Sequence, residues 1–121
     1  MKASWLYITA GTRDEAQAIA RTLVEERLVA CANIFGGMDS VYWWDGAVKS
    51  ETEVAFIVKT RASLVDAVIA RITELHSYDC PYVVALAIDG GNPDYLAWIE
   101  AETREAIEDG GKAPLRAEEG D

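Results

Sequence analysis

The hydrophobic positions of the chain follow two spacings, and the change from one spacing to the other divides the chain into strands and helices. Short apolar runs rich in β-branched and aromatic residues are typical of buried strands. Longer stretches in which apolar residues recur every three or four positions predict amphipathic helices that cover a sheet. The predicted strands include residues 4–10, 29–35 and 82–88, and the predicted helices cover residues 13–28, 64–76 and about 93–106.

Polar residues mark where these helices should begin. Thr12 followed three positions later by Glu15 is a capping-box signature for the first helix, and Ser63 with Asp66 predicts a similar pair for the second. Asn92-Pro93 is typical of an N-cap followed by proline at the first helical position.

A long hairpin is predicted in the middle of the chain. Residues 38–44 continue the strand that Gly36-Gly37 interrupts, and paired glycines inside a strand pattern indicate a bulge. Asp45-Gly46 predicts a tight turn, because a type I′ turn requires positive φ at both positions. The return strand is expected from Ala47 to Lys59. Each strand would then have about 12–14 residues, against about 5–6 for an ordinary strand.

The order strand, helix, strand, strand, helix, strand, helix predicts an α+β fold. Two strand–helix–strand units joined by a hairpin form the ferredoxin-like split βαβ sandwich, here with a long central β-hairpin and a C-terminal helix. We expect residues 1–106 to form one such domain. Residues 107–121 lack the periodic pattern and predict a flexible acidic tail.

Charge and cysteine content narrow the class of protein. Lys and Arg number 11 and Asp and Glu number 21, so the net charge is 11 − 21 = −10. Such acidity argues against binding to nucleic acid and against docking on anionic membranes. No stretch reaches the ~20 apolar residues of a membrane-spanning helix. With two cysteines and no signal-peptide pattern, the expected location is cytoplasmic.

The hairpin carries more exposed apolar surface than one chain can cover. Two helices on one sheet face cannot reach strands of this length, and a lone two-stranded ribbon is marginally stable in water. We therefore expect other copies of the chain to cover it. The alternative is that the third helix folds back over the hairpin. The residues concerned are Val41, Tyr42, Trp43, Trp44 and Val48.

One cluster has the chemistry of a metal site. His76, the only histidine, is followed by Asp79 and Cys80, and imidazole, carboxylate and thiolate all bind first-row metals. A helix that continued through them would place the three on one side, but Pro81 favours an end near His76. The alternative is a histidine at a helix C-terminus, stabilised by the helix dipole.

Several segments resemble the CutA divalent-cation tolerance family in order and spacing over roughly residues 4–106. The matching segments are Arg27–Ile34, Ser40–Gly46, Glu53-Val54, Lys59-Thr60, Ser63–Val65, His76, Tyr78, Pro81, Gly91-Asn92 and Tyr95–Ile99. The helix exit reads His76-Ser77-Tyr78-Asp79 where the family usually has His-Pro-Tyr-Glu. Tyr82 stands where an acidic residue is frequent, and Ala10 lies near the place of a cysteine that some members carry.

The resemblance implies a homotrimer whose long hairpins pair across subunit boundaries, a response to metal ions, and copper binding in some members. Our first interpretation is a non-enzymatic trimer that binds copper or another divalent metal ion weakly at subunit clefts, through His76, Asp79 and Cys80. The alternative is a small-ligand or signalling module of the PII type, which shares the gross architecture. No nucleophile–base pair in the sequence recommends an enzyme.

Overall fold

A computed structural model describes residues 1–106, and the element order predicted from the sequence is confirmed. Residues 107–121, for which we expected a flexible acidic tail, lie outside the described residues. The elements are β1 (Ala3–Ala10), α1 (Arg13–Glu25), β2 (Cys31–Trp44), β3 (Ala47–Arg61), a short 3-10 helix (Ala62–Leu64), α2 (Val65–Leu75), β4 (Val83–Ile88) and α3 (Pro93–Glu102).

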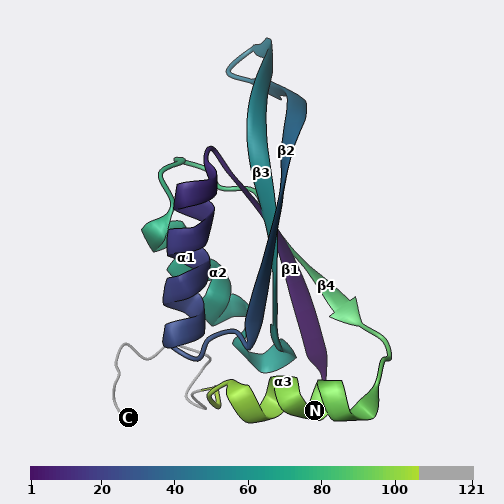
Figure 1. The fold of residues 1–121 in the computed structure, drawn as a ribbon. Coiled ribbons are helices and arrows are strands. Elements are labelled where there is room, and N and C mark those ends of the chain that lie inside the picture. The colour runs from purple at the N-terminus through teal and green to yellow at the C-terminus, as the bar shows by residue number, and fades with distance from the viewer. Residues whose placement is uncertain (107–121) are drawn as a thin grey trace.

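The four strands form one antiparallel sheet in the order β2-β3-β1-β4, with α1 and α2 on one face (Figure 1). This arrangement confirms the ferredoxin-like α+β fold. Alternation along each strand sends one set of apolar side chains towards the two helices. The largest side chains of this core include Leu6, Ile8, Leu23, Phe56, Val58, Val68 and Ile72, all fully buried.

Two of the three predicted helix starts are confirmed. Thr12 Oγ1 accepts a hydrogen bond from Glu15 N at 3.1 Å, and Asn92 Oδ1 accepts one from Asp94 N at 3.0 Å. The predicted pair of Ser63 and Asp66 is wrong. Ser63 lies inside the 3-10 helix, and α2 begins after it without a side-chain cap.

The hairpin has the predicted bulge and turn. β2 and β3 pair from Cys31 opposite Lys59 up to the turn, with one register shift between Gly36 and Met38. Both turn residues have positive φ, 53° at Asp45 and 77° at Gly46. Since β1 stops pairing with β3 at Val54, the rest of the hairpin projects beyond the sheet (Figure 1).

The third helix does not cover the hairpin, so that alternative is wrong. α3 lies at the opposite end of the molecule, where Ile99 packs against Ala3 and Ala30 (Figure 1). In the single chain Trp43 is 74% exposed and Trp44 is 50% exposed.

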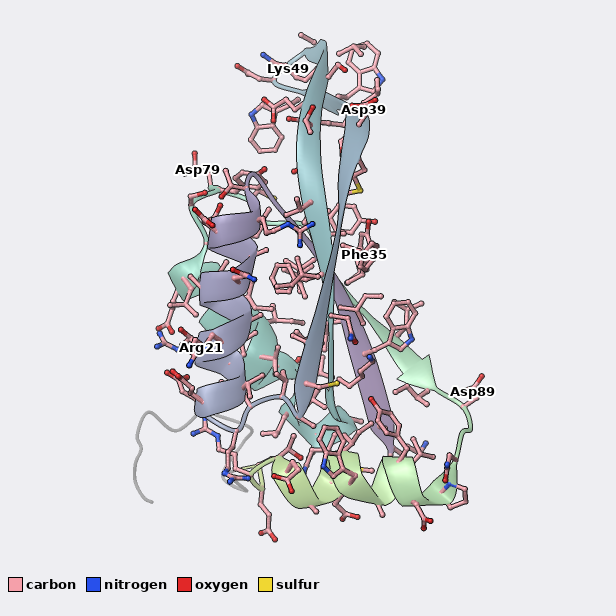
Figure 2. The ribbon with its side chains drawn as sticks, in the orientation of Figure 1. Arg21, Phe35, Asp39, Lys49, Asp79 and Asp89 are labelled. Atoms are coloured by element: carbon pink, nitrogen blue, oxygen red, sulfur yellow. The ribbon has the colours of Figure 1, made fainter. Side chains whose placement is uncertain are left out.

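The sheet face opposite α1 and α2 is also uncovered, and we call it the open face. Strand alternation and register place on it the apolar side chains of Trp5, Tyr7, Phe35, Ile57, Val84 and Leu86. Phe35, Val84 and Leu86 are each more than 40% exposed. Figure 2 shows Phe35 on the side of the strands away from α1.

Candidate functional site

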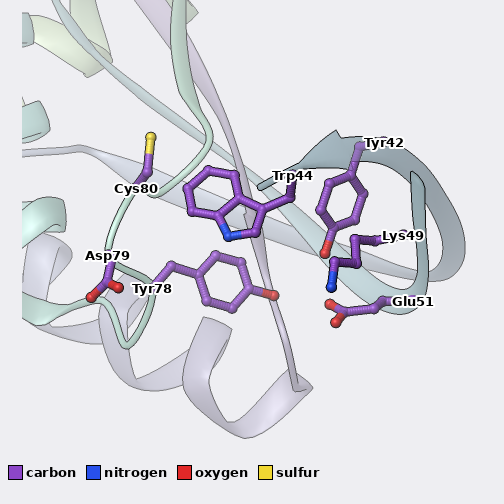
Figure 3. Close-up of a pocket in the computed structure, with 7 residues that line it drawn as sticks. All are labelled: Tyr42, Trp44, Lys49, Glu51, Tyr78, Asp79 and Cys80. Carbon is purple, nitrogen blue, oxygen red and sulfur yellow. The ribbon is translucent and has the colours of Figure 1, made fainter. Parts of the chain in front are cut away.

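A cavity of about 320 Å³ lies between the projecting hairpin and the loop that joins α2 to β4 (Figure 3). The hairpin contributes aromatic, basic and acidic side chains, and the loop contributes an aromatic ring, a carboxylate and a thiol. The lining residues are Tyr42, Trp44, Lys49, Glu51, Tyr78, Asp79 and Cys80.

Tyr78 joins the loop to the hairpin. Its hydroxyl donates a hydrogen bond to Glu53 Oε2 at 2.8 Å. Glu53 is the β3 residue next to Val54, where the pairing of β3 with β1 ends. Burial and this contact raise the pKa of Tyr78 well above its usual value. Across the cavity, the hydrogen bond between Tyr42 and Glu51 raises the pKa of Tyr42. Both phenols therefore stay protonated and act as hydrogen-bond donors at neutral pH.

His76 is held by the backbone. Its Nε2 lies 2.7 Å from the carbonyl oxygen of Thr9, which can only accept, and its Nδ1 lies 3.1 Å from the Tyr78 amide, which can only donate. The neutral ring with the proton on Nε2 satisfies both contacts. The side chain is fully buried, and Glu15 Oε2 lies 3.6 Å from Nδ1.

Glu15 ties the start of α1 to the same loop. Its Oε2 accepts a hydrogen bond from the Ser77 amide at 2.8 Å. Burial of the Glu15 carboxylate acts to raise its pKa, but the contacts with Ser77 and the nearby His76 outweigh burial and lower it. The Glu15 side chain, which the sequence indicated as part of a capping box, thus stabilises the exit of α2.

The structure does not bring the predicted metal ligands together. α2 ends at Leu75, and His76 has an extended ψ of 146°, so helical spacing does not apply beyond it. Asp79 and Cys80 are exposed and line the cavity, whereas His76 is buried and does not line it. Among residues 1–106, no group of three or more His, Cys, Asp and Glu side chains is placed to hold a metal ion. A single chain therefore does not fit a chelated copper ion, and ligation by these three residues stays a prediction.

Sequence reasoning missed the link between Tyr78 and Glu53. The sequence feature that could have indicated this link is Glu53, an acidic residue where the polar part of β3 meets its wholly apolar part. Glu53 is only 8% exposed, which is unusual for a carboxylate.

The described part of the chain contains no helix that is both long enough and apolar enough to cross a membrane.

Comparison with known proteins identifies the family. The family model described as CutA1 divalent ion tolerance protein matches residues 4–102. "Protein CutA 1, chloroplastic" from Oryza sativa subsp. japonica is 43% identical over 101 residues, which are 84% of this chain and 57% of the rice protein. The chain thus spans little more than half the length of that relative.

A relative of similar length and a solved structure support the same family. "Divalent-cation tolerance protein CutA" from Pyrococcus horikoshii is 39% identical over 99 residues, 82% of this chain and 96% of the relative. The crystal structure of CutA1 from Oryza sativa has a TM-score of 0.85 and 40% identity, covering 88% of this chain and 97% of that one. The family-model match over residues 4–102 and this level of identity together show that the chain belongs to the CutA1 divalent ion tolerance family.

Proposed function

We propose that this protein is a non-enzymatic divalent-cation tolerance protein that works as a homotrimer. The observation that carries the proposal is the apolar surface that one chain leaves uncovered. This surface runs from the open face along the hairpin, and it includes Leu86, Val84 and Trp44. Monomeric proteins rarely expose a continuous apolar surface of this kind.

The energetic gain from covering this surface is large enough for a permanent assembly. Fully burying one exposed large apolar side chain contributes about 1.5–3 kcal/mol, and the open face presents three exposed and three partly buried ones. A two-fold dimer that pairs one outer edge with its copy leaves the other outer edge of each sheet free, whereas a closed ring lets each subunit use both β2 and β4. A ring of three is what the resemblance to the CutA family implies.

The oligomeric state can be tested by measuring native mass by light scattering. The expected mass is three times 13.2 kDa. Leu86→Glu places a charge on the open face and should dissociate the particle. Val24→Glu is the matched control, because Val24 on α1 is 38% exposed and Leu86 is 41% exposed in the single chain. A folded wild-type particle of 13.2 kDa would contradict the proposal.

The proposal includes metal binding, but with only part of the ligand set supplied by a single chain. Asp79 and Cys80 offer two exposed donors at the mouth of the cavity, so copper or another divalent ion requires further donors from a neighbouring subunit. His76 can join them only by giving up both of its backbone contacts.

Calorimetry with Cu²⁺ and Zn²⁺ tests this part of the proposal. Cys80→Ser should remove saturable binding. Cys31→Ser is the control, since Cys31 is half-buried at the other end of β2 and its Sγ lies 3.5 Å from the Tyr95 hydroxyl. Binding that survives Cys80→Ser would contradict the proposed ligands.

The second candidate function, a PII-type small-ligand or signalling module, is favoured by the cavity itself. Lys49 is the one basic residue that the described part of the chain contributes to its lining, together with the acidic Glu51 and Asp79, so a nucleotide phosphate finds little positive charge there. Titration with ATP on the same sample separates the two functions, and we expect no saturation. We keep the cytoplasm as the proposed location of this chain, although the name of the rice relative assigns that protein to the chloroplast.

A further inference from the structure

A second cavity, of about 400 Å³, adjoins the first and opens towards the open face. The two share Tyr42, Trp44, Tyr78 and Cys80 in their walls. Its volume lies within the range of about 300–1,000 Å³ that is usual for small-molecule sites. Five of its lining residues are aromatic, namely Tyr7, Tyr42, Trp44, Tyr78 and Tyr82.

One lining residue carries a charge. Among residues 1–106, Glu53 is the only Asp, Glu, Lys, Arg or His residue that lines this cavity. It is 8% exposed, and the Tyr78 hydroxyl is the one hydrogen-bond donor that residues 1–106 supply to its carboxylate. A buried carboxylate with a single neutral donor is poorly compensated, because carboxylates in protein interiors are usually paired with a cation or with several donors.

Aromatic ring faces around a buried negative charge favour a positively charged organic ligand. Aromatic rings present negative faces that attract ammonium groups, and the carboxylate supplies the counter-charge. Tyr7 and Tyr82 meet edge to face, with centroids 5.5 Å apart and an interplanar angle of 70°, so their rings form a wall of fixed shape. The net charge of −10 also favours the approach of cations.

Other ligand classes fit less well. No lysine or arginine in the described part of the chain lines this cavity, so phosphate or carboxylate ligands would face Glu53 without compensation. A hard divalent ion requires about six oxygen ligands, and one carboxylate among phenol rings does not provide them.

We propose that the cavity between the hairpin stem, β1 and the α2–β4 loop binds a small organic cation, an alkylammonium compound whose charged group lies against Glu53 and the rings of Trp44 and Tyr78. One proposed metal donor, Cys80, also lines this cavity, but the cation site uses Glu53 and the aromatic rings and does not depend on metal binding. Because it opens towards the open face, a neighbouring subunit would lie beside it, and the test must use the full chain in its native assembly.

The test is calorimetric titration with choline and, in parallel, with 3,3-dimethyl-1-butanol, which has the same shape without the charge. We expect saturable binding of choline, and binding of the neutral alcohol at least about tenfold weaker. Equal binding of the two compounds, or no saturation at millimolar choline, would overturn the proposal.

Variants identify the residues responsible. Glu53→Gln still accepts the hydrogen bond from Tyr78 but removes the charge, so choline affinity should fall about tenfold or more. Asp39→Asn is the matched control, because Asp39 is an exposed carboxylate on the same hairpin and lines neither cavity. Native mass and circular dichroism check that both variants fold and assemble. A folded Glu53→Gln protein with unchanged choline affinity would refute the assignment.

Discussion

The replacement of His76 by leucine distinguishes a structural histidine from a metal ligand. The imidazole fills the place one residue beyond the last β1–β4 pair, Ile8 with Val83, where the Thr9 carbonyl has no partner from β4. The imidazole Nδ1 also accepts a hydrogen bond from the Tyr78 amide. Leucine has a similar volume but no polar atom, so His76→Leu leaves both backbone groups without their partner.

The expected loss of stability follows from these two contacts. Each net hydrogen bond contributes about 1 kcal/mol, and a buried polar group left unsatisfied costs about 1–3 kcal/mol. Because the loop can admit water to the Tyr78 amide more easily than to the Thr9 carbonyl, we expect a total of about 2–4 kcal/mol. For a domain of this size each kcal/mol corresponds to roughly 3–6 °C in Tm.

The measurement is guanidinium unfolding followed by tryptophan fluorescence, at one protein concentration, since assembly makes apparent stability concentration-dependent. His76→Gln is the matched control, because its amide can still donate to the Thr9 carbonyl, and we expect it to recover about half of the loss. A His76→Leu protein as stable as the wild type, but with lost copper binding, would refute the structural role and favour the metal site.

Three further substitutions test local parts of the structure. Thr12→Ala removes the N-cap of α1 and should cost about 1 kcal/mol in thermal unfolding. Gly36→Ala should cost about 1–3 kcal/mol by urea unfolding, because Gly36 has a φ of 116° and a Cβ there would lie 3.1 Å from Val54 Cα. Folding lowers the pKa of Glu15, so its contribution to stability is present above the unfolded pKa of 4.5 and is lost as the pH falls through the lower pKa of the folded state. Glu15→Gln should therefore lower stability at pH 7, where the contact with Ser77 is charged, and differ little from the wild type at pH 3.

Local chemistry made most of the fold predictable. Asp45-Gly46 and Gly36-Gly37 identified the turn and the bulge, because few residues tolerate positive φ and the hairpin twist requires it. Thr12 and Asn92 identified helix starts through their short side chains. Ser63 was misread because a 3-10 turn precedes α2, and a side chain inside that turn cannot cap the helix that follows.

The site was less predictable, because its contacts join distant parts of the chain. The spacing of His76, Asp79 and Cys80 indicated a metal site only if the helix continued, and α2 ends one residue before His76. The contact of Tyr78 with Glu53 depends on where β1 ends and on the path of the α2–β4 loop. No local sequence pattern predicts either of these.

The bulge determines which aromatic side chains share a face with Glu53. Gly36 pairs with Val54, and the next pair is Met38 with Glu53, so Gly37 is the extra residue. Because side chains alternate along a strand, this single insertion places every second residue from Met38 to Trp44 on the face of Glu53. If the same sequence paired without the bulge, with Gly37 opposite Glu53, that face would carry Asp39 and Trp43 instead. The Asp39 carboxylate would then lie opposite Glu51, and the cavity would lose the indole of Trp44. The glycine pair therefore supplies the register that both the aromatic wall and the proposed cation site require, in addition to the bend that lets the hairpin leave the sheet.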